Sequence, residues 1–231
     1  TISTSATNKD FSDLHKLDVP YQVVVSDNHY YVHLVTDEEE VKSLQSINHF
    51  KNTLVDLGLK MKTGLVVDFR SRELLRDSED DSTIPLIYSM HIKDGRVRFP
   101  QGKEKEYIVK DRKGLMQENR NYLFVKRFTA KEERRRLQCG IYLKRYLSSF
   151  TYISSQNKVN FIDGLQGLSE CVVYGLYVIF NSTLYDVYYR ILNGSTQVNS
   201  TEINAMPVPD MSVIEAMGKQ LIAAKNLSVE Q

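Results

Sequence analysis

Two apolar segments, separated by a short charged stretch, constrain the fold most. They are residues 121–128 (NYLFVKRF) and residues 134–143 (RRRLQCGIYL), with TAKEE between them. The apolar residues that fall on one side of the second segment are Leu137, Cys139, Ile141 and Leu143. This period of two predicts a β-strand, and the first segment supplies an antiparallel partner. Thr129 and Glu132 also match a helix capping box, so a helical turn between the segments is an alternative to a hairpin.

Strand-like and helix-like patterns follow one another along the rest of the chain. Strands are expected at residues 20–35 as a pair around the turn SDN, at 63–70, at 84–100 as a hairpin with glycine in its turn, and at 158–162. Helices are expected at residues 37–57, at 167–192 with a break or new cap at 181–183, and at 212–226. Thr36 is suited to cap the first helix and Gly58 to end it. The order predicts an α+β fold: an antiparallel sheet with hairpins, an amphipathic helix on the N-terminal side and a helical C-terminal part.

Composition excludes several classes of function. The chain has 231 residues and a net charge of +1, so it is not basic overall. Its five histidines are scattered, and neither a G-x-G-x-x-G loop after a strand nor a P-loop motif is present. Asp68 followed by KEKEY at 103–107 is the nearest match to the carboxylates of a metal-dependent nuclease, but short charged segments arise by chance. Two cysteines in apolar runs, no signal peptide and no bilayer-spanning run predict a cytoplasmic protein without a membrane partner.

Positive charge concentrates between residues 126 and 145, where eight basic residues and two acidic residues give a local charge of +6. Such a run is also typical of a solvated hairpin face. Arginine on a strand suits phosphate and guanine, because its planar guanidinium donates two parallel hydrogen bonds. Residues 193–209 (NGSTQVNSTEINAMPVP) add neutral amides and hydroxyls, which bind base edges or phosphates without titrating. In the hairpin at 84–100, alternation places Arg96 and Arg98 together on one face.

Three segments resemble a known family. They are residues 53–75 (TLVDLGLKMKTGLVVDFRSRELL), 121–137 (NYLFVKRFTAKEERRRL) and 175–209 (GLYVIFNSTLYDVYYRILNGSTQVNSTEINAMPVP). In this order they resemble the C-terminal target-recognition region of adenine-specific, N6-methylating DNA methyltransferases from bacterial type II restriction–modification systems. The resemblance covers about residues 40–210 and implies recognition of double-stranded DNA.

The motifs that the chain lacks limit what this resemblance implies. Such methyltransferases bind S-adenosylmethionine with a glycine-rich loop and hold a flipped adenine against an [Asn/Asp]-Pro-Pro-[Tyr/Phe] motif. The chain has no Pro-Pro pair and no such loop. The resemblance therefore implies a recognition domain at residues 36–210, a junction with a catalytic domain at 1–35 and a C-terminal helix at 211–231. Catalysis and the cofactor S-adenosylmethionine would belong to the missing catalytic domain, which is an expected partner.

Charge pattern and resemblance together assign the DNA contacts. The residues expected to bind the phosphate backbone are Lys126, Arg127, Lys131, Arg134 and Arg135, with Arg70 and Arg72 as candidates for the same face. The residues expected to make neutral contacts are Asn193, Thr196, Gln197 and Asn199. A self-bonded loop, with Asn199 and Glu202 capping a short helix, is the alternative for this second set. Base readers are alternatively expected in the segments outside the family-like motifs, 101–120 and 146–160.

Two other functions stay open. One is a self-sufficient metal-dependent nuclease that uses Asp68, and the other is a protein-interaction domain whose basic strip pairs with an acidic partner. If the DNA-binding hypothesis holds, charge reversal at Arg134 and Arg135 is expected to weaken binding to every sequence and to leave the fold intact.

Overall fold

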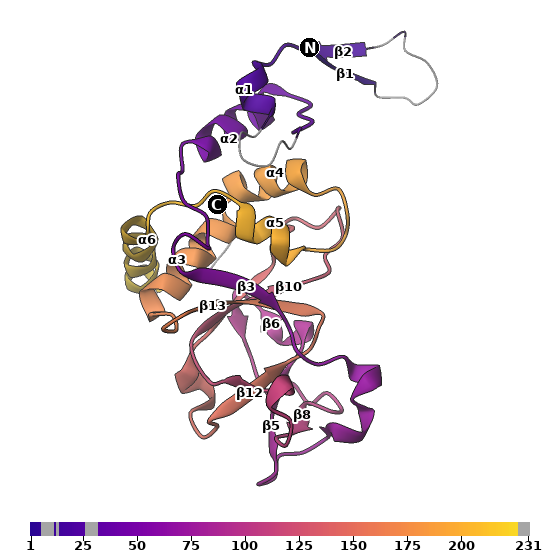
Figure 1. Cartoon of the computed structure of the whole chain (residues 1–231), viewed down its shortest axis with the longest axis vertical. Helices are drawn as coiled ribbons and strands as arrows, with labels where there is room; N and C mark the ends of the chain where they lie inside the picture. Colours follow the sequence, from indigo (N-terminus) through magenta and orange to yellow (C-terminus); the bar gives the residue numbers. More distant parts are fainter. Residues whose placement is uncertain (6–11, 13, 26–31, 226–231) are drawn as a thin grey trace.

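The computed structural model describes residues 1–5, 12, 14–25 and 32–225. Its strands are β1 (Ile2–Ser5), β2 (Leu14–Leu17), β3 (Leu59–Thr63), β4 (Leu75–Arg76), β5 (Thr83–Ile87), β6 (Ile92–Lys93), β7 (Arg96–Val97), β8 (Tyr107–Val109), β9 (Gln117–Glu118), β10 (Tyr122–Lys126), β11 (Cys139–Tyr142), β12 (Tyr152–Ser155) and β13 (Val159–Gly164). Its α-helices are α1 (Tyr21–Val24), α2 (Glu38–Asn48), α3 (Glu170–Asn181), α4 (Thr183–Leu192), α5 (Ser200–Ala205) and α6 (Met211–Ala224). Short 3-10 helices include η1 (Asp68–Arg70), η2 (Arg72–Leu74) and η4 (Lys113–Leu115). The predicted α+β class is confirmed (Figure 1).

A six-stranded sheet in the order β3-β13-β10-β11-β7-β6 forms the middle of the molecule (Figure 1). β10 pairs antiparallel with β11 and with β13, which confirms the predicted strand pair. β7 pairs parallel with β11, so the sheet is mixed rather than purely antiparallel. Asp94 and Gly95, with φ of 49° and 71°, turn the chain from β6 into β7. Positive φ at both positions suits a two-residue hairpin, and the predicted hairpin is confirmed in this smaller form.

Both faces of the six-stranded sheet are buried, because both sets of alternating residues along its strands are apolar. Leu123 and Val125 of β10 face the helix-side core, which also contains residues of α3 and α4. Tyr122 and Phe124, which alternate with them, face a second core on the other side. The four residues of 134–143 that were predicted to share one side all lie in the helix-side core.

A second sheet, in the order β4-β8-β5-β12-β9, forms the lower end of the molecule in Figure 1. It encloses a smaller core of its own around Leu86 and Ile108. β5, expected to form a hairpin with the following strand, instead pairs antiparallel with β8 and parallel with β12. The expected single hairpin at 84–100 is therefore divided between two sheets.

The C-terminal helices pack over one face of the six-stranded sheet and enclose the helix-side core. Ser169 caps α3 and Ser182 caps α4, each by accepting a hydrogen bond from a backbone N–H, which confirms the predicted new cap at 181–183. α6 packs on α3 where Gly175 and Gly218 allow close contact: a Cβ would lie 1.9 Å from Ile214 O and 1.8 Å from Cys171 O, respectively. α6 matches the predicted final helix, and residues 226–231 lie outside the described residues.

The predicted N-terminal helix is confirmed as α2 but is shorter than expected. α2 ends at Asn48, and beyond it Asn52 O accepts a hydrogen bond from Val208 N. Its cap is Asp37 rather than Thr36, and Asp37 accepts from Glu40 N at 2.9 Å. In the described part of residues 20–35, the short helix α1 replaces the first predicted strand, and Val25 forms a bridge with Val32. The predicted turn at 26–28 and the start of the second predicted strand, up to residue 31, lie outside the described residues.

The strand expected at 63–70 lies earlier, as β3. A Cβ at Gly64 would lie 2.1 Å from Gln156 O, and from this point the chain leaves the sheet. Val66 N then donates to Ser155 O at 2.9 Å, and η1 follows.

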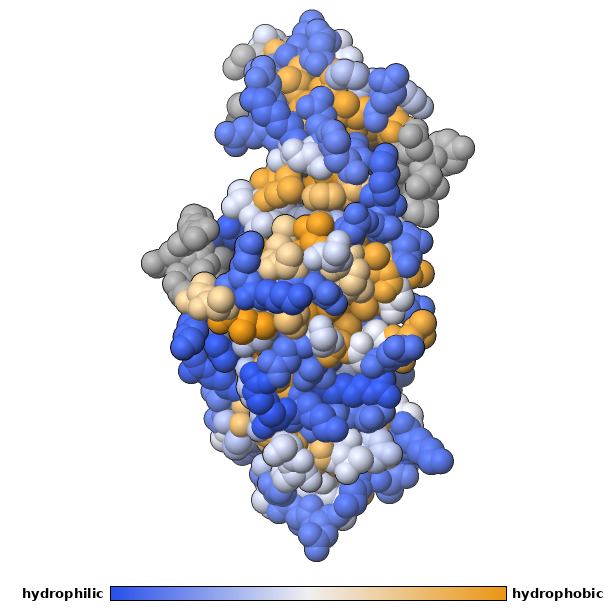
Figure 2. Space-filling view, turned by 90° about the vertical axis from the view of Figure 1, so that its left-hand side faces the viewer, coloured by the Kyte–Doolittle hydropathy of each residue, from blue (hydrophilic) through white to orange (hydrophobic). Residues whose placement is uncertain are grey.

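The hydropathy of the surface changes along the long axis of the molecule. On the face that carries α6, Figure 2 shows apolar surface gathered over the middle of the molecule and a mostly hydrophilic end below it. Among the described helices, none has the length and apolar character that crossing a membrane requires.

Candidate nucleic-acid interface

Two loops that are far apart in sequence lie side by side. The basic loop, residues 127–138, connects β10 to β11, and the amide loop, residues 193–199, connects α4 to α5. Their backbones are joined by hydrogen bonds from Val198 N to Arg127 O (2.7 Å) and from Thr129 N to Thr196 O (3.1 Å). The cationic segment and the amide-rich helix end therefore adjoin. The segment between the strands is not helical, so the capping-box alternative at Thr129 and Glu132 is wrong.

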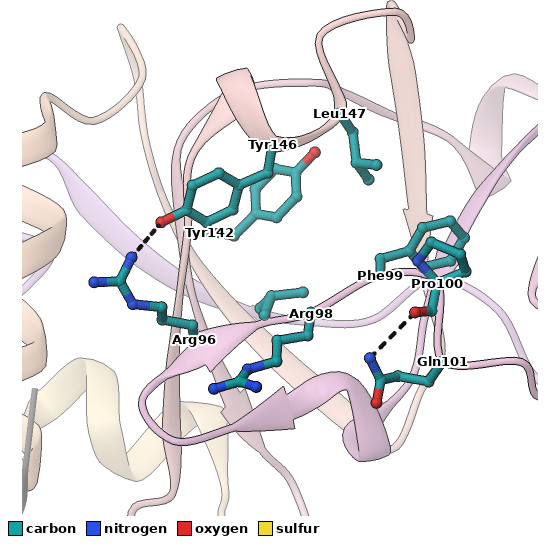
Figure 3. Close-up of a pocket in the computed structure, with 9 residues that line it drawn as sticks. Arg96, Arg98, Phe99, Pro100, Gln101, Tyr142, Tyr146 and Leu147 are labelled. Carbon is teal, nitrogen blue, oxygen red and sulfur yellow. Dashed lines mark hydrogen bonds between the residues drawn. The ribbon is translucent and has the colours of Figure 1, made fainter.

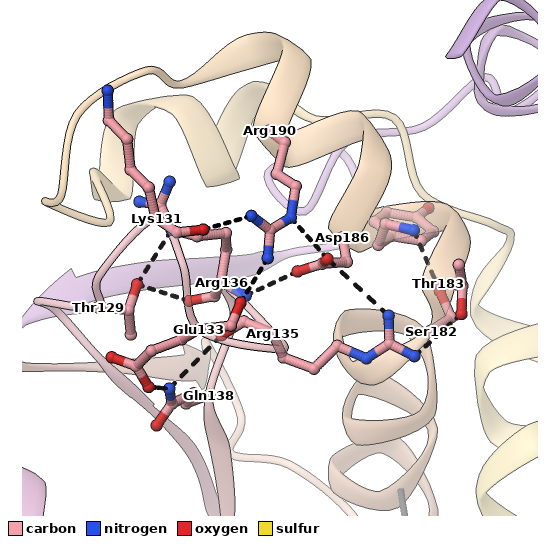
Figure 4. A network of polar contacts seen from close by, with 11 residues as sticks. Thr129, Lys131, Glu133, Arg135, Arg136, Gln138, Ser182, Thr183, Asp186 and Arg190 are labelled. Carbon is pink, nitrogen blue, oxygen red and sulfur yellow. Dashed lines mark hydrogen bonds and ion pairs between the residues drawn. The ribbon is translucent and has the colours of Figure 1, made fainter. Parts of the chain in front are cut away.

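A buried carboxylate on α4 holds the basic loop in place (Figure 4). Asp186 is 5% exposed, and it accepts hydrogen bonds from Arg136 N at 2.7 Å and from Arg190 Nε at 2.8 Å. Arg135 Nη1 lies 3.9 Å from the same carboxylate. Asp186 and Arg190 stand one helical turn apart, so α4 presents a preformed ion pair to the loop.

Arg190 also binds the backbone of the basic loop, so Asp186 and Arg190 together form a clamp on this loop. Arg136 adds a link to the amide loop. Arg190 donates from Nη1 to Lys131 O at 2.6 Å and from Nη2 to Glu133 O at 2.7 Å. Arg136 is 1% exposed and donates from Nη2 to Ser195 O at 2.6 Å, which links the basic loop to the amide loop. These arginines therefore determine the shape of the basic loop and are not part of its exposed charge.

The predicted phosphate-binding residues occupy different environments. Lys131 and Arg134 are exposed on the basic loop. Lys126 and Arg127 are half-buried, and Arg127 Nη1 donates to a backbone carbonyl, Asn157 O, at 2.9 Å. Phe128, which sequence reasoning missed, is 48% exposed, and the guanidinium of Arg127 lies 5.6 Å from the centre of its ring.

Arg135 is committed to the fold. Its side chain is 15% exposed, faces Asp186 and donates to Thr183 Oγ1 at 2.9 Å. A glutamate at this position would face the buried carboxylate of Asp186. These contacts revise the expectation from sequence: charge reversal at Arg135 is now expected to destabilise the fold.

The amide loop is partly self-bonded. Asn193 is 5% exposed, and its Oδ1 accepts from Ser195 N at 2.7 Å while its Nδ2 donates to the carboxylate of Glu202. Asn199 caps α5 and accepts from Thr201 N at 3.0 Å. The alternative of a self-bonded loop thus describes Asn193 and Asn199, although Glu202 bonds to Asn193 rather than to the helix end. Thr196 is exposed and Gln197 is half-buried on the strip that borders the basic loop.

Arg70 and Arg72 are exposed, but they lie on η1 and η2 rather than at the end of a strand. Phe69 beside them is 66% exposed, and the guanidinium of Arg70 lies 5.4 Å from its ring centre. The hydrogen bonds that join the basic loop to the amide loop do not involve this segment.

Glu106, one of the carboxylates of the suggested nuclease motif, is buried among hydrogen-bond donors. Glu106 accepts from His91 Nε2 at 2.6 Å, from Gln101 N at 2.8 Å and from Gly102 N at 3.0 Å. Tyr88 N donates to His91 Nδ1, so Nε2 of this imidazole carries the proton. Within the described ranges, no three His, Cys, Asp or Glu side chains are grouped as metal ligands.

The His91–Glu106 pair predicts a loss of stability in mild acid. Burial lowers the pKa of His91 below its ordinary 6.5. Burial acts to raise the pKa of Glu106, but hydrogen bonds from His91 and from two backbone amides outweigh it and hold the pKa below the ordinary 4.5. Both groups therefore bind protons more tightly in the unfolded chain. The contribution of His91 is complete above pH 6.5 and decreases as the pH falls below that value, and the contribution of Glu106 decreases below pH 4.5.

Urea denaturation between pH 7.5 and pH 5 measures this dependence, and the midpoint is expected to fall with pH. His91→Gln removes the titrating group and should flatten the curve in this range. His33, whose pKa is also lowered by burial, stays in the variant as an internal reference of the same sign. An unchanged slope in His91→Gln would assign the pH dependence to other groups.

Two type II methyltransferases are similar to this chain over most of its length. No protein-family model matches the chain. The chain is 32% identical over 223 residues to the type II methyltransferase M.BsuBI of Bacillus subtilis, which covers 94% of the chain and 44% of that protein. It is 34% identical over 211 residues to the type II methyltransferase M.PstI of Providencia stuartii, which covers 88% of the chain and 41% of that protein. The chain thus spans less than half the length of these curated relatives, which are type II methyltransferases similar to it over most of its own length.

Proposed function

We propose that this chain is the target-recognition part of an adenine-N6 DNA methyltransferase of a restriction–modification system. The observation that carries the proposal is the match of nearly the whole chain to less than half of two type II methyltransferases. A part of such an enzyme that lacks the cofactor loop and the adenine-holding motif has DNA recognition as its remaining task. S-adenosylmethionine and the methyl transfer would belong to the rest of the full-length protein, with residues 1–35 at the junction.

The geometry of the basic and amide loops supports this assignment. Lys131 and Arg134 place two exposed cations where the clamp of Asp186 and Arg190 fixes the loop backbone. Phosphate contacts from such residues give affinity that depends strongly on salt and little on sequence. Thr196 adds an exposed hydroxyl along the same border, which suits neutral contacts to phosphate oxygens.

The two segments suggested as alternative base readers come together in space. Residues 101–120 contain β8, η4 and β9, and residues 146–160 contain β12. β12 pairs antiparallel with β9, with Tyr152 opposite Glu118, so both segments belong to the five-stranded sheet. One compact surface could therefore carry sequence-reading side chains while the six-stranded sheet keeps its core.

Selection of the isolated chain against a pool of random duplex DNA tests the proposal. We expect enrichment of one short sequence over several rounds at moderate salt, with weaker binding to the unselected pool. A duplex pool that is bound without any enriched sequence would contradict target recognition. Binding to an acidic protein but not to duplex would instead favour the protein-interaction function.

A further inference from the structure

A pocket at the β6–β7 hairpin is lined by residues outside the basic loop and the amide loop. It has a volume of about 370 Å³, and the residues that line it are Arg96, Val97, Arg98, Phe99, Pro100, Gln101, Tyr142, Tyr146 and Leu147. Figure 3 shows the two arginines on one side, the tyrosines across from them, and Phe99 with Pro100 at one end. Arg96 and Arg98 both line the pocket, as does Val97 between them, so the predicted alternation of these residues stays a prediction.

The pocket combines aromatic walls with cations. Tyr146 is half-buried and packs edge-to-face on Tyr142, with ring centres 6.2 Å apart. Arg96 Nη1 donates to Tyr146 Oη at 3.3 Å, and among the described ion pairs none gives Arg96 a carboxylate partner. Arg98 pairs with Asp94 at 2.8 Å, but both side chains are more than half exposed, so a phosphate can readily replace this carboxylate.

We propose that this pocket binds one unstacked nucleotide of a DNA strand, with its base against Tyr146 and its phosphate on Arg96 and Arg98. This proposal rests on DNA being the ligand of the chain. The volume lies at the lower end of the range of about 300–1,000 Å³ that is usual for small-molecule sites, which suits one nucleotide. Aromatic rings bind a base through its flat face, and guanidinium groups bind a phosphate through paired hydrogen bonds.

The pocket is separate from the basic loop, so the two can be tested independently. The basic loop enters β11 at Cys139, whereas Tyr142 at the other end of β11 lines the pocket. Cys139 and Tyr142 are three steps apart along the strand, or about 10 Å at roughly 3.3 Å per residue. A substitution in the pocket can therefore change nucleotide binding without touching the clamp that shapes the basic loop.

Fluorescence anisotropy with two duplexes tests the proposal: one fully paired, and one of the same sequence with a single unpaired adenosine. We expect the isolated chain to prefer the unpaired duplex by roughly five- to a hundredfold, the range that one stacked base provides. Tyr146→Leu and Arg96→Gln should each remove this preference. Arg96→Gln should also leave binding to the paired duplex unchanged, because residue 96 lies outside the basic loop, the amide loop and the segments 101–120 and 146–160. Lys42→Gln, at an exposed lysine of α2 outside the pocket, should keep the preference.

The outcomes separate this inference from the proposed function. Binding of the paired duplex without any preference for the unpaired one overturns the pocket assignment and leaves target recognition standing. A preference that survives both pocket variants also overturns it. Deoxyadenosine 5′-monophosphate should compete with the unpaired duplex better than inorganic phosphate does. Equal competition by inorganic phosphate would show a site for anions alone and overturn the base contact. Should Tyr146→Leu fail to fold, Arg98→Gln, at a side chain that is 54% exposed, carries the same test.

Discussion

Asp186→Ala is expected to lower the free energy of unfolding by roughly 3–5 kcal/mol, because it leaves buried donors without their partner. Asp186 accepts from Arg136 N and from Arg190 Nε, and it faces Arg135. Without it, the backbone N–H of Arg136 and the guanidinium groups of Arg190 and Arg135 lose their carboxylate partner, and the basic loop loses one of its attachments to α4. Urea denaturation monitored by circular dichroism measures the change.

The matched comparison is Asp94→Asn with Asp186→Asn, because asparagine tolerates the φ of 49° at residue 94. Both variants remove the charge of a carboxylate paired with an arginine four residues away. Asp94 is 77% exposed, so Asp94→Asn is expected to change stability by less than about 1 kcal/mol. Asp186→Asn keeps an oxygen for Arg136 N, so it should destabilise the fold less than Asp186→Ala but more than Asp94→Asn. Equal stability of the two asparagine variants would show that the buried network does not hold the loop.

Neutralising the exposed cations of the basic loop is expected to weaken DNA binding strongly without unfolding the protein. In Lys131→Gln with Arg134→Gln, each lost phosphate contact should reduce affinity about tenfold near 0.1 M salt. The slope of log K against log salt should become shallower by about 1 for each contact. Anisotropy at several salt concentrations measures both quantities on a duplex of fixed sequence.

The control for this pair is Lys42→Gln with Lys219→Gln, which removes the same charge from exposed positions on α2 and α6. These helices lie away from the basic loop in Figure 1, so the slope should stay unchanged. If both double variants shift the slope equally, the loop is not a specific phosphate-binding surface.

Alternation and caps predicted the parts of the fold that local chemistry determines. The β10–β11 pair, the β6–β7 turn at Gly95 and the cap at Ser182 follow from period-two patterning, positive φ and a side-chain acceptor, respectively. The end of α2 and the position of β3 were set by distant partners instead. Asn52 bonds to Val208 and Val66 bonds to Ser155, and neither contact has a local signal.

The same limit applies to the interface. A cluster of arginines in the sequence shows where charge is concentrated. It does not show which guanidinium groups are buried or bonded to other parts of the fold. Arg136 is buried and Arg135 faces Asp186, so the surface charge of the basic loop is smaller than its sequence suggests. One signal was available: Asp186 and Arg190 stand at i and i+4 on a helix whose other residues are largely apolar, where an acid implies an internal partner.

The most direct test of the account is hydrogen–deuterium exchange of the isolated chain with and without a selected duplex. The basic loop and the amide loop are predicted to become protected together on binding, because their backbones are hydrogen-bonded to each other and face the same ligand. Protection confined to other segments, with residues 127–138 and 193–199 exchanging as in the free chain, would contradict the assignment of this surface to DNA.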